Sequence, residues 1–226
     1  MKDFLNAYKL YFKTTFSPGL AVLGVFLMLF HFLTLLVLGW KYLEESEIEI
    51  GLLSVPLIFH AFVILFFQKY NKVTQNKFFF SMKNAKQYYT IIPMAVVGSV
   101  YLIVDIISFI MSLCLFGGEY AGDVLVFYSA GTVLMTLHHV TQELPQISGL
   151  SAIALIFTMV ISPPAICYTS GFKYGLELPL GIDILISLGI YVVGAALIIG
   201  IMTLWWNKSG RNLTFIEKDI WGFRKS

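Results

Sequence analysis

Residues 93–116 have the sequence PMAVVGSVYLIVDIISFIMSLCLF, a long apolar run that holds one carboxylate, that of Asp105. An α-helix needs about 20 mainly apolar residues to cross the roughly 30 Å hydrocarbon core of a bilayer, so this run predicts a transmembrane helix. The 226-residue chain is 58% hydrophobic and 12% charged, whereas soluble domains are about 45–50% apolar and about 25% charged. The sequence therefore predicts a polytopic membrane protein and excludes soluble enzymes and nucleic-acid-binding domains.

Five other runs are also long and apolar enough to span a membrane. With the first, the predicted spans are residues 19–40, 50–67, 93–116, 122–140, 149–167 and 180–206. The fourth is the least apolar, because polar residues such as Asp123 and Thr132 dilute it. We expect an all-α integral membrane protein with one transmembrane domain over residues 1–226. Its six-helix bundle occupies residues 19–206, and a cytoplasmic tail occupies residues 207–226.

The basic residues of the predicted loops indicate the orientation. With the N-terminus in the cytoplasm, 13 of the 15 basic residues lie inside, and only Lys41 and Lys173 lie outside. Cytoplasmic loops carry the excess of Lys and Arg in membrane proteins. The prediction is a multi-pass plasma-membrane protein with both termini in the cytoplasm. Because Lys far outnumbers Arg, we expect a bacterial source.

The first 17 residues form a predicted interfacial helix. Their apolar side chains recur at helical spacing, and their lysines fall mainly on the opposite face. Such a helix lies in the headgroup plane rather than crossing the bilayer. Ser17-Pro18 then breaks it before the first span. It acts either as a simple anchor or as an elbow that braces the bundle and touches a cytoplasmic partner.

Residues 75–93, QNKFFFSMKNAKQYYTIIP, predict a short amphipathic helix between the second and third spans. Aromatic and Met side chains on one face of such a helix are suited to a groove in a partner protein. The alternative is a helix that lies on lipid headgroups while its lysines snorkel. The candidate partner-coupling residues are Phe78, Phe79, Met82, Lys83, Lys86, Tyr88 and Tyr89.

Between the fifth and sixth spans, residues 161–181 contain Pro163-Pro164 followed by a Gly-rich, aromatic segment. Adjacent prolines disrupt helical hydrogen bonding. We expect either a re-entrant hairpin in the outer leaflet, serving as an outer gate, or an irregular loop.

This layout resembles the membrane (permease) subunits of type-two ABC exporters, in particular the small Gram-positive peptide and drug exporters. The resemblance rests on the N-terminal elbow helix, six spans, the segment QNKFFFSMKNAKQYY and the outer hairpin. It implies two copies of a separate cytoplasmic ATPase that bind ATP and Mg, with residues 77–89 seated in an ATPase cleft and residues 2–16 bracing it. It also implies a second membrane subunit, identical or paralogous. This chain would bind no cofactor itself.

Asp105 is the first candidate site residue. An ionised Asp at the bilayer centre costs about 2.5–3.5 kcal/mol on insertion scales, so its side chain should face protein or water. It either contacts a polar or cationic substrate or a proton, or forms a structural tie to His31 or His60, which also fall near mid-span.

His139 and Glu143 lie at the cytoplasmic end of the fourth span and are i, i+4 neighbours. Two such side chains can share a metal ion, but no third ligand lies nearby in the sequence, so we expect no metal site. They instead mark the second cytoplasmic loop. Cys114 and Cys167 lie in apolar stretches and are expected to be small buried side chains, with a disulfide as the alternative.

The predicted function is export of amphipathic or hydrophobic substrates, because the spans offer few polar groups. No residue of this chain is expected to perform covalent chemistry, and the sequence lacks a phosphate-binding loop of the P-loop type. Two alternatives remain: a stand-alone proton-coupled carrier using Asp105, and a six-helix substrate-capture subunit. Ala196 and Gly200 are small enough for close approach of a second membrane subunit.

Overall fold

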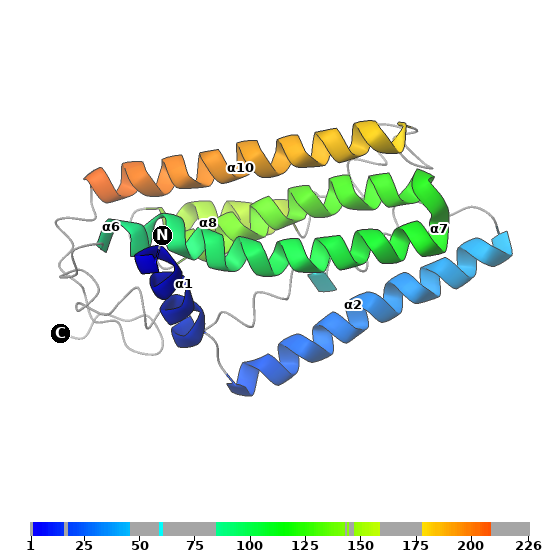
Figure 1. Cartoon of the computed structure of the whole chain (residues 1–226), viewed down its shortest axis with the longest axis horizontal. Helices are drawn as coiled ribbons and strands as arrows, with labels where there is room; N and C mark the ends of the chain where they lie inside the picture. Colours follow the sequence, from blue (N-terminus) through cyan, green and yellow to red (C-terminus); the bar gives the residue numbers. More distant parts are fainter. Residues whose placement is uncertain are drawn as a thin grey trace.

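The computed structural model describes residues 2–15, 18–45, 59–60, 85–142, 144, 147–158 and 178–208. All regular structure in these residues is helical, which confirms the expected all-α class for this part of the chain (Figure 1). The helices are α1 (Lys2–Thr15), α2 (Pro18–Glu45), α6 (Ala85–Tyr89), α7 (Ile91–Thr141), α8 (Ser148–Ile156) and α10 (Leu180–Lys208).

Among the described residues, four helical segments are long and apolar enough to cross a membrane. They are Val22–Lys41, Ala85–Gly118, Tyr120–Thr141 and Leu180–Lys208. These correspond to the first, third, fourth and sixth predicted spans, and they indicate a multi-pass membrane protein. Most of the second predicted span, and the fifth beyond Thr158, lie outside the described residues. The same holds for the expected outer hairpin before Leu178.

α7 is a helical hairpin rather than one straight helix (Figure 1). Gly117 has φ 75° and ψ −171°, a conformation that is essentially restricted to glycine. The chain reverses there, so that Ile91–Phe116 and the residues after Gly118 form two adjacent arms. The reversal falls between the third and fourth predicted spans, as the sequence indicates.

The second arm of α7 lies in the interior of the bundle, and this position explains why its sequence is more polar than that of the other spans. Ser129, Thr132 and Thr136 are all buried. In a lipid environment such hydroxyl groups are favourable when they face neighbouring helices rather than hydrocarbon. The least apolar span is therefore the most central one. In contrast, α10 exposes many large apolar side chains, as expected for a helix that faces lipid.

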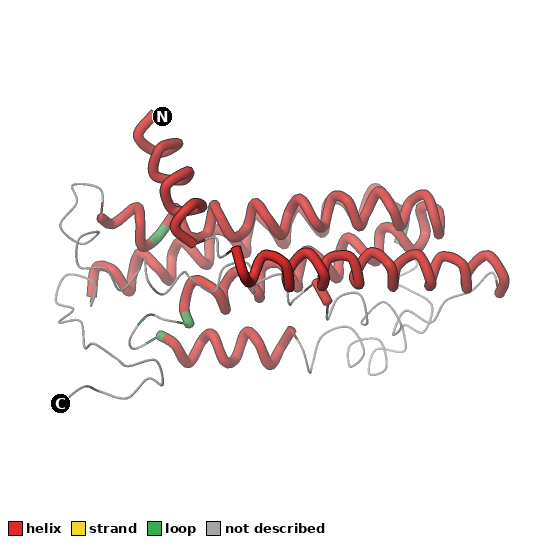
Figure 2. The backbone as a smooth tube through the Cα atoms, turned by 90° about the horizontal axis from the view of Figure 1, so that it is seen from below, coloured by secondary structure: helices red, strands yellow, loops and turns green. Residues whose placement is uncertain are grey.

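α1 crosses the end of the bundle at a steep angle (Figure 2). Ala7 and Tyr11 are buried, while Leu5 and Phe12 are exposed. The Tyr8 hydroxyl lies 2.6 Å from the Ser99 hydroxyl of α7. α1 thus combines one side that packs on the bundle with exposed apolar side chains suited to an interface.

The expectation for Cys114 is wrong. Its side chain is exposed on α7 and free, not buried. An exposed position on a lipid-facing helix suits a small apolar side chain equally well, which is why the sequence alone does not separate the two environments. Cys167 lies outside the described residues.

Candidate functional site

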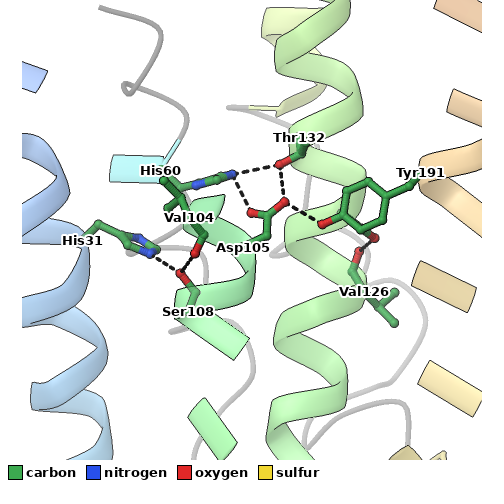
Figure 3. A network of polar contacts seen from close by, with 9 residues as sticks. His31, His60, Val104, Asp105, Ser108, Val126, Thr132 and Tyr191 are labelled. Carbon is green, nitrogen blue, oxygen red and sulfur yellow. Dashed lines mark hydrogen bonds and ion pairs between the residues drawn. The ribbon is translucent and has the colours of Figure 1, made fainter. Parts of the chain in front are cut away.

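Asp105 sits midway along the first arm of α7 and is 1% exposed. Its Oδ2 accepts two short hydrogen bonds, from the hydroxyl of Thr132 at 2.6 Å and from the phenol of Tyr191 at 2.6 Å. Thr132 belongs to the second arm of α7, and Tyr191 belongs to α10 (Figure 3). One carboxylate therefore ties three membrane-spanning segments together at mid-bundle.

His60 completes this arrangement from a segment distant in sequence. Its Nε2 lies 3.1 Å from Asp105 Oδ1 and 3.1 Å from Thr132 Oγ1. Because Thr132 gives its only hydroxyl hydrogen to Asp105, it can only accept from His60. His60 Nε2 therefore carries a hydrogen. Asp105 and His60 are thus in polar contact, as in the structural tie that the sequence analysis offers as one of two roles for Asp105.

His31 occupies a neighbouring position but does not contact Asp105 directly. Its Nε2 lies 2.7 Å from Ser108 Oγ, which in turn donates to the Val104 carbonyl at 2.8 Å. Ser108 has thus used its hydrogen, so His31 is the donor. His31 links α2 to the same face of α7 that carries Asp105 (Figure 3).

Aromatic rings close the site around the histidines. The His60 ring stacks on Tyr128 with centroids 5.3 Å apart and planes 9° apart. Tyr101 meets the His60 ring edge-on at 5.2 Å, and His31 lies 5.7 Å from His60. All four rings are fully buried. The rings therefore shield the histidine side of the site from solvent, which strengthens the electrostatic interactions there.

Three buried atoms of the site have no hydrogen-bond partner among the described residues: Asp105 Oδ1, His60 Nδ1 and the Tyr128 hydroxyl. A carboxylate oxygen and an imidazole nitrogen are both groups that take up a proton. Chemically, the site can hold a buried charge pair or exchange a proton. Among the described residues, no three His, Cys, Asp or Glu side chains lie close enough together to hold a metal ion.

The expected coupling segment is described only from Ala85 onward, so Phe78, Phe79, Met82 and Lys83 lie outside the described residues. Tyr88 and Tyr89 are 7% and 2% exposed. Both side chains are therefore buried within the described bundle, which does not favour the partner contact expected for them. Lys86 is exposed. The coupling role of the segment stays a prediction. Within α6, the exposed Lys86 is the candidate residue that a partner can reach.

Tyr88 and Tyr89 belong to an aromatic end cluster that joins α1, α6 and α10. Tyr89 stacks on Trp206 at 5.4 Å and 24°, and lies 6.4 Å from Trp205. Tyr11 of α1 belongs to the same buried cluster, as does Ile92 of α7. The aromatic end cluster thus consists of Tyr11, Tyr88, Tyr89, Trp205 and Trp206.

The histidines at the end of α7 have structural partners. His138 Nδ1 lies 2.7 Å from the Ser151 hydroxyl and 2.9 Å from its carbonyl, which joins α7 to α8. His139 is fully buried and its Nδ1 lies 3.4 Å from the Gln142 amide. Glu143 lies outside the described residues. A role for His139 in a partner-facing loop stays a prediction that its burial does not favour.

Two members of the Asp105 site, Thr132 and Tyr191, were not singled out as site residues from the sequence. A usable signal exists: both are hydroxyl-bearing residues within otherwise apolar spans. In hydrocarbon such groups need hydrogen-bond partners, so an Asp in a nearby span is their natural acceptor. Comparison of the chain with protein-family models, with curated proteins and with solved structures finds no match.

Proposed function

We propose that the chain is the membrane subunit of an ATP-driven exporter, energised by a separate cytoplasmic ATPase. The observation that carries this proposal is the aromatic end cluster. Through Tyr89 and Trp206, a short helix outside the bundle interior is packed directly on the end of α10, and Tyr11 brings α1 into the same cluster. A force applied at Lys86 would therefore reach three helices at once.

The positions of the helix ends support the six-span arrangement that the proposal requires. The C-terminal end of α2 and the short α6 lie at opposite ends of the bundle (Figure 1). His60, which lies between them in the sequence, contacts Asp105 at mid-bundle. α7 ends at the end of the bundle where α10 also ends, whereas α10 begins at the opposite end (Figure 1). With the four long helices, the second and fifth predicted spans would complete the proposed six.

The substrate class follows from the membrane-spanning segments. Their exposed residues are mainly Leu, Ile and Val, whereas their carboxylates, such as Asp105, Asp123 and Asp183, are buried within the bundle. We propose that the exported molecule is amphipathic or hydrophobic, and that a second membrane subunit completes the pathway. Ala196 is exposed on α10 and a Cβ at Gly200 would meet nothing within 4 Å, so both positions are open to close helix contact.

The test is purification of the tagged chain from its native membranes in mild detergent, followed by identification of stoichiometric companions. The proposal expects an ATPase subunit at about one copy per chain. Lys86→Glu should remove this companion and leave the bundle folded. Lys41→Glu, at the opposite end of the bundle, is the matched charge reversal and should retain it. A chain that purifies alone, or a Lys86→Glu protein that keeps its ATPase, contradicts the proposal.

A second candidate function, a proton-coupled carrier that works alone, is favoured by the contact between His60 and Asp105. Asp105 Oδ1 is a buried proton acceptor with no hydrogen bond from the described residues. In proteoliposomes, Asp105→Asn should abolish transport driven by a pH gradient if the chain is such a carrier. ATP-driven transport by the reconstituted complex should survive the same substitution.

A further inference from the structure

The helix α1 has two faces of different character. Ala7 and Tyr11, one helical turn apart, are buried against the bundle. Lys9 and Lys13, also one turn apart, are exposed. Because each residue of a helix is rotated by about 100° from the one before it, the two lysines point away from the face that holds Ala7 and Tyr11. One face of α1 is therefore fixed on the bundle while the opposite face presents two cations.

These cations belong to a basic surface at one end of the bundle. Lys86 of α6 and Lys208 of α10 are also exposed at this end (Figure 1). Residues 4–13, 85–89 and 201–208, whose side chains the structure describes, include no Asp or Glu. Within the described part of the chain, neither lysine of α1 has an ion pair. The described surface thus carries positive charge without a negative partner of its own.

The surroundings of α1 follow from its position and from its exposed apolar side chains. α1 lies beside the end of the bundle, at a steep angle to the long helices, and its N-terminal part projects sideways from them (Figures 1 and 2). Phe4 and Leu5 lie on this projecting part and are 38% and 50% exposed. Leu5 precedes Lys9 by one turn, so the two share one side of the helix. In a bundle that spans a membrane, this position is at the level of the lipid headgroups.

We propose that α1 binds the headgroups of anionic phospholipids, with Lys9 and Lys13 at the phosphates and Phe4 and Leu5 against the upper part of the acyl chains. This assigns the helix a selectivity for lipid charge, which a simple anchor does not have. The proposal does not depend on an ATPase partner, so it stands apart from the proposed function.

The charge and the shape of the lysine side chain both favour this ligand. In the predicted orientation α1 faces the cytoplasmic leaflet, whose anionic lipids make its surface negative, and each Lys near such a surface strengthens binding by about fivefold. The long apolar stems of Lys9 and Lys13 let their ammonium groups reach the phosphates while the helix stays in the interface. An acidic protein surface could also attract the two lysines, but it would leave Phe4 and Leu5 uncovered beside the bundle.

The test uses the purified full chain in phosphatidylcholine vesicles with a trace of spin-labelled phosphatidylglycerol or spin-labelled phosphatidylcholine. The fraction of each label that the protein immobilises gives the preference for the anionic lipid. We expect a preference for phosphatidylglycerol at low salt. It should fall when the ionic strength rises from about 0.01 M to about 1 M, since the screening length shrinks from about 30 Å to about 3 Å. Equal immobilisation of the two labels at low salt overturns the proposal.

Paired substitutions locate the preference on α1. Lys9→Glu with Lys13→Glu should lower it by at least about threefold. Lys9→Arg with Lys13→Arg is the matched control, because it keeps both charges on the same helix and should retain the preference. A preference that survives the Glu pair, or that falls equally in both pairs, overturns the assignment to these lysines.

A fluorescent label tests the apolar contact. Bimane on Leu5→Cys, in a chain with Cys114→Ser and Cys167→Ser, should be quenched by a nitroxide on the upper acyl chain and protected from iodide in the water. The reverse pattern would place this side of α1 in solvent and overturn the proposal.

The outcomes distinguish lipid binding from a role in the proposed ATPase complex. If the Glu pair loses an ATPase companion but keeps the lipid preference, the two lysines serve a protein partner, and the lipid proposal fails while the proposed function stands. If the lipid preference is present and is lost in the Glu pair of a chain that purifies alone, α1 binds anionic lipid and the proposed function fails. The measurements on the unaltered chain need no variant to fold.

Discussion

The phenol of Tyr191 donates a 2.6 Å hydrogen bond to Asp105 Oδ2 and so joins α10 to the first arm of α7. This bond runs from a lipid-facing helix to a carboxylate that is 1% exposed. Hydrogen bonds to charged groups contribute about 1.5–3 kcal/mol in proteins, whereas side-chain bonds between membrane helices average about 0.6 kcal/mol. The Tyr191–Asp105 bond thus links α10 directly to the buried site.

Tyr191→Phe should lower the free energy of unfolding by about 1–2 kcal/mol, because Asp105 loses one of its two donors. Tyr128→Phe is the matched control: the Tyr128 hydroxyl is buried but has no hydrogen-bond partner in the described part of the chain, so its removal should be neutral or stabilising. Unfolding in mixed micelles, followed by tryptophan fluorescence, measures both. Equal losses in the two variants would contradict the assigned bond.

His60 and Asp105 should behave as a coupled pair. Removing one partner of a buried pair costs about 3–5 kcal/mol, because the other is left uncompensated. His60→Phe and Asp105→Leu should each be strongly destabilising, while the double variant should lose less than the sum by about 1–3 kcal/mol. Free energies of unfolding for the four proteins give the coupling. Simple additivity would show that the 3.1 Å contact carries no net interaction.

Asp105 was predictable because its chemistry is local: a carboxylate within an apolar helix must face protein or water. Its partners Thr132 and Tyr191 were not. Which residues meet depends on the relative depth of separate helices, and that depth is set by the reversal at Gly117 and by packing far from Asp105. A hydropathy pattern places residues along one helix but not across a bundle.

The helices also separate into features that a local pattern predicts and features that depend on contacts between distant segments. The apolar runs predict the spans that the structure describes, since length and composition decide whether a segment crosses a bilayer. The stripe containing Tyr88 and Tyr89 also marks an amphipathic face. What covers that face is decided by Trp205 and Trp206, at the far end of the chain. The local pattern therefore identified the face, whereas the residues that cover Tyr89 come from a distant part of the chain.

Tyr89→Ala should destabilise the isolated chain by about 3–5 kcal/mol, as large-to-small substitutions of buried aromatic residues do. The reason is that Tyr89 is 2% exposed and stacked on Trp206. Lys86→Glu, three residues earlier and exposed, should leave the free energy of unfolding within about 0.5 kcal/mol of wild type. Unfolding of the partner-free protein checks both. A neutral Tyr89→Ala would mean that the side chain is free for a partner.

Gly194 and Gly189 provide a matched pair on α10 for testing how closely it packs on α7. A Cβ at Gly194 would lie 2.5 Å from both Cγ atoms of Val133, whereas a Cβ at Gly189 would meet nothing within 4 Å. Val133 is β-branched and has one strongly preferred rotamer in a helix, so it cannot turn aside. Gly194→Ala must therefore move the two helices apart.

Overpacking of this kind costs about 1–3 kcal/mol, while replacing an unconstrained helical glycine by alanine gains up to about 1 kcal/mol. Gly194→Ala should thus lower the free energy of unfolding and Gly189→Ala should raise it or leave it unchanged. Both substitutions replace a helical glycine by alanine, so their gain in helix propensity is the same. The difference between their free energies of unfolding therefore isolates the contact with Val133. If both variants were stabilised equally, α10 would not lie against the second arm of α7 at this position, and the hydrogen bond from Tyr191, one turn away, would fail with it.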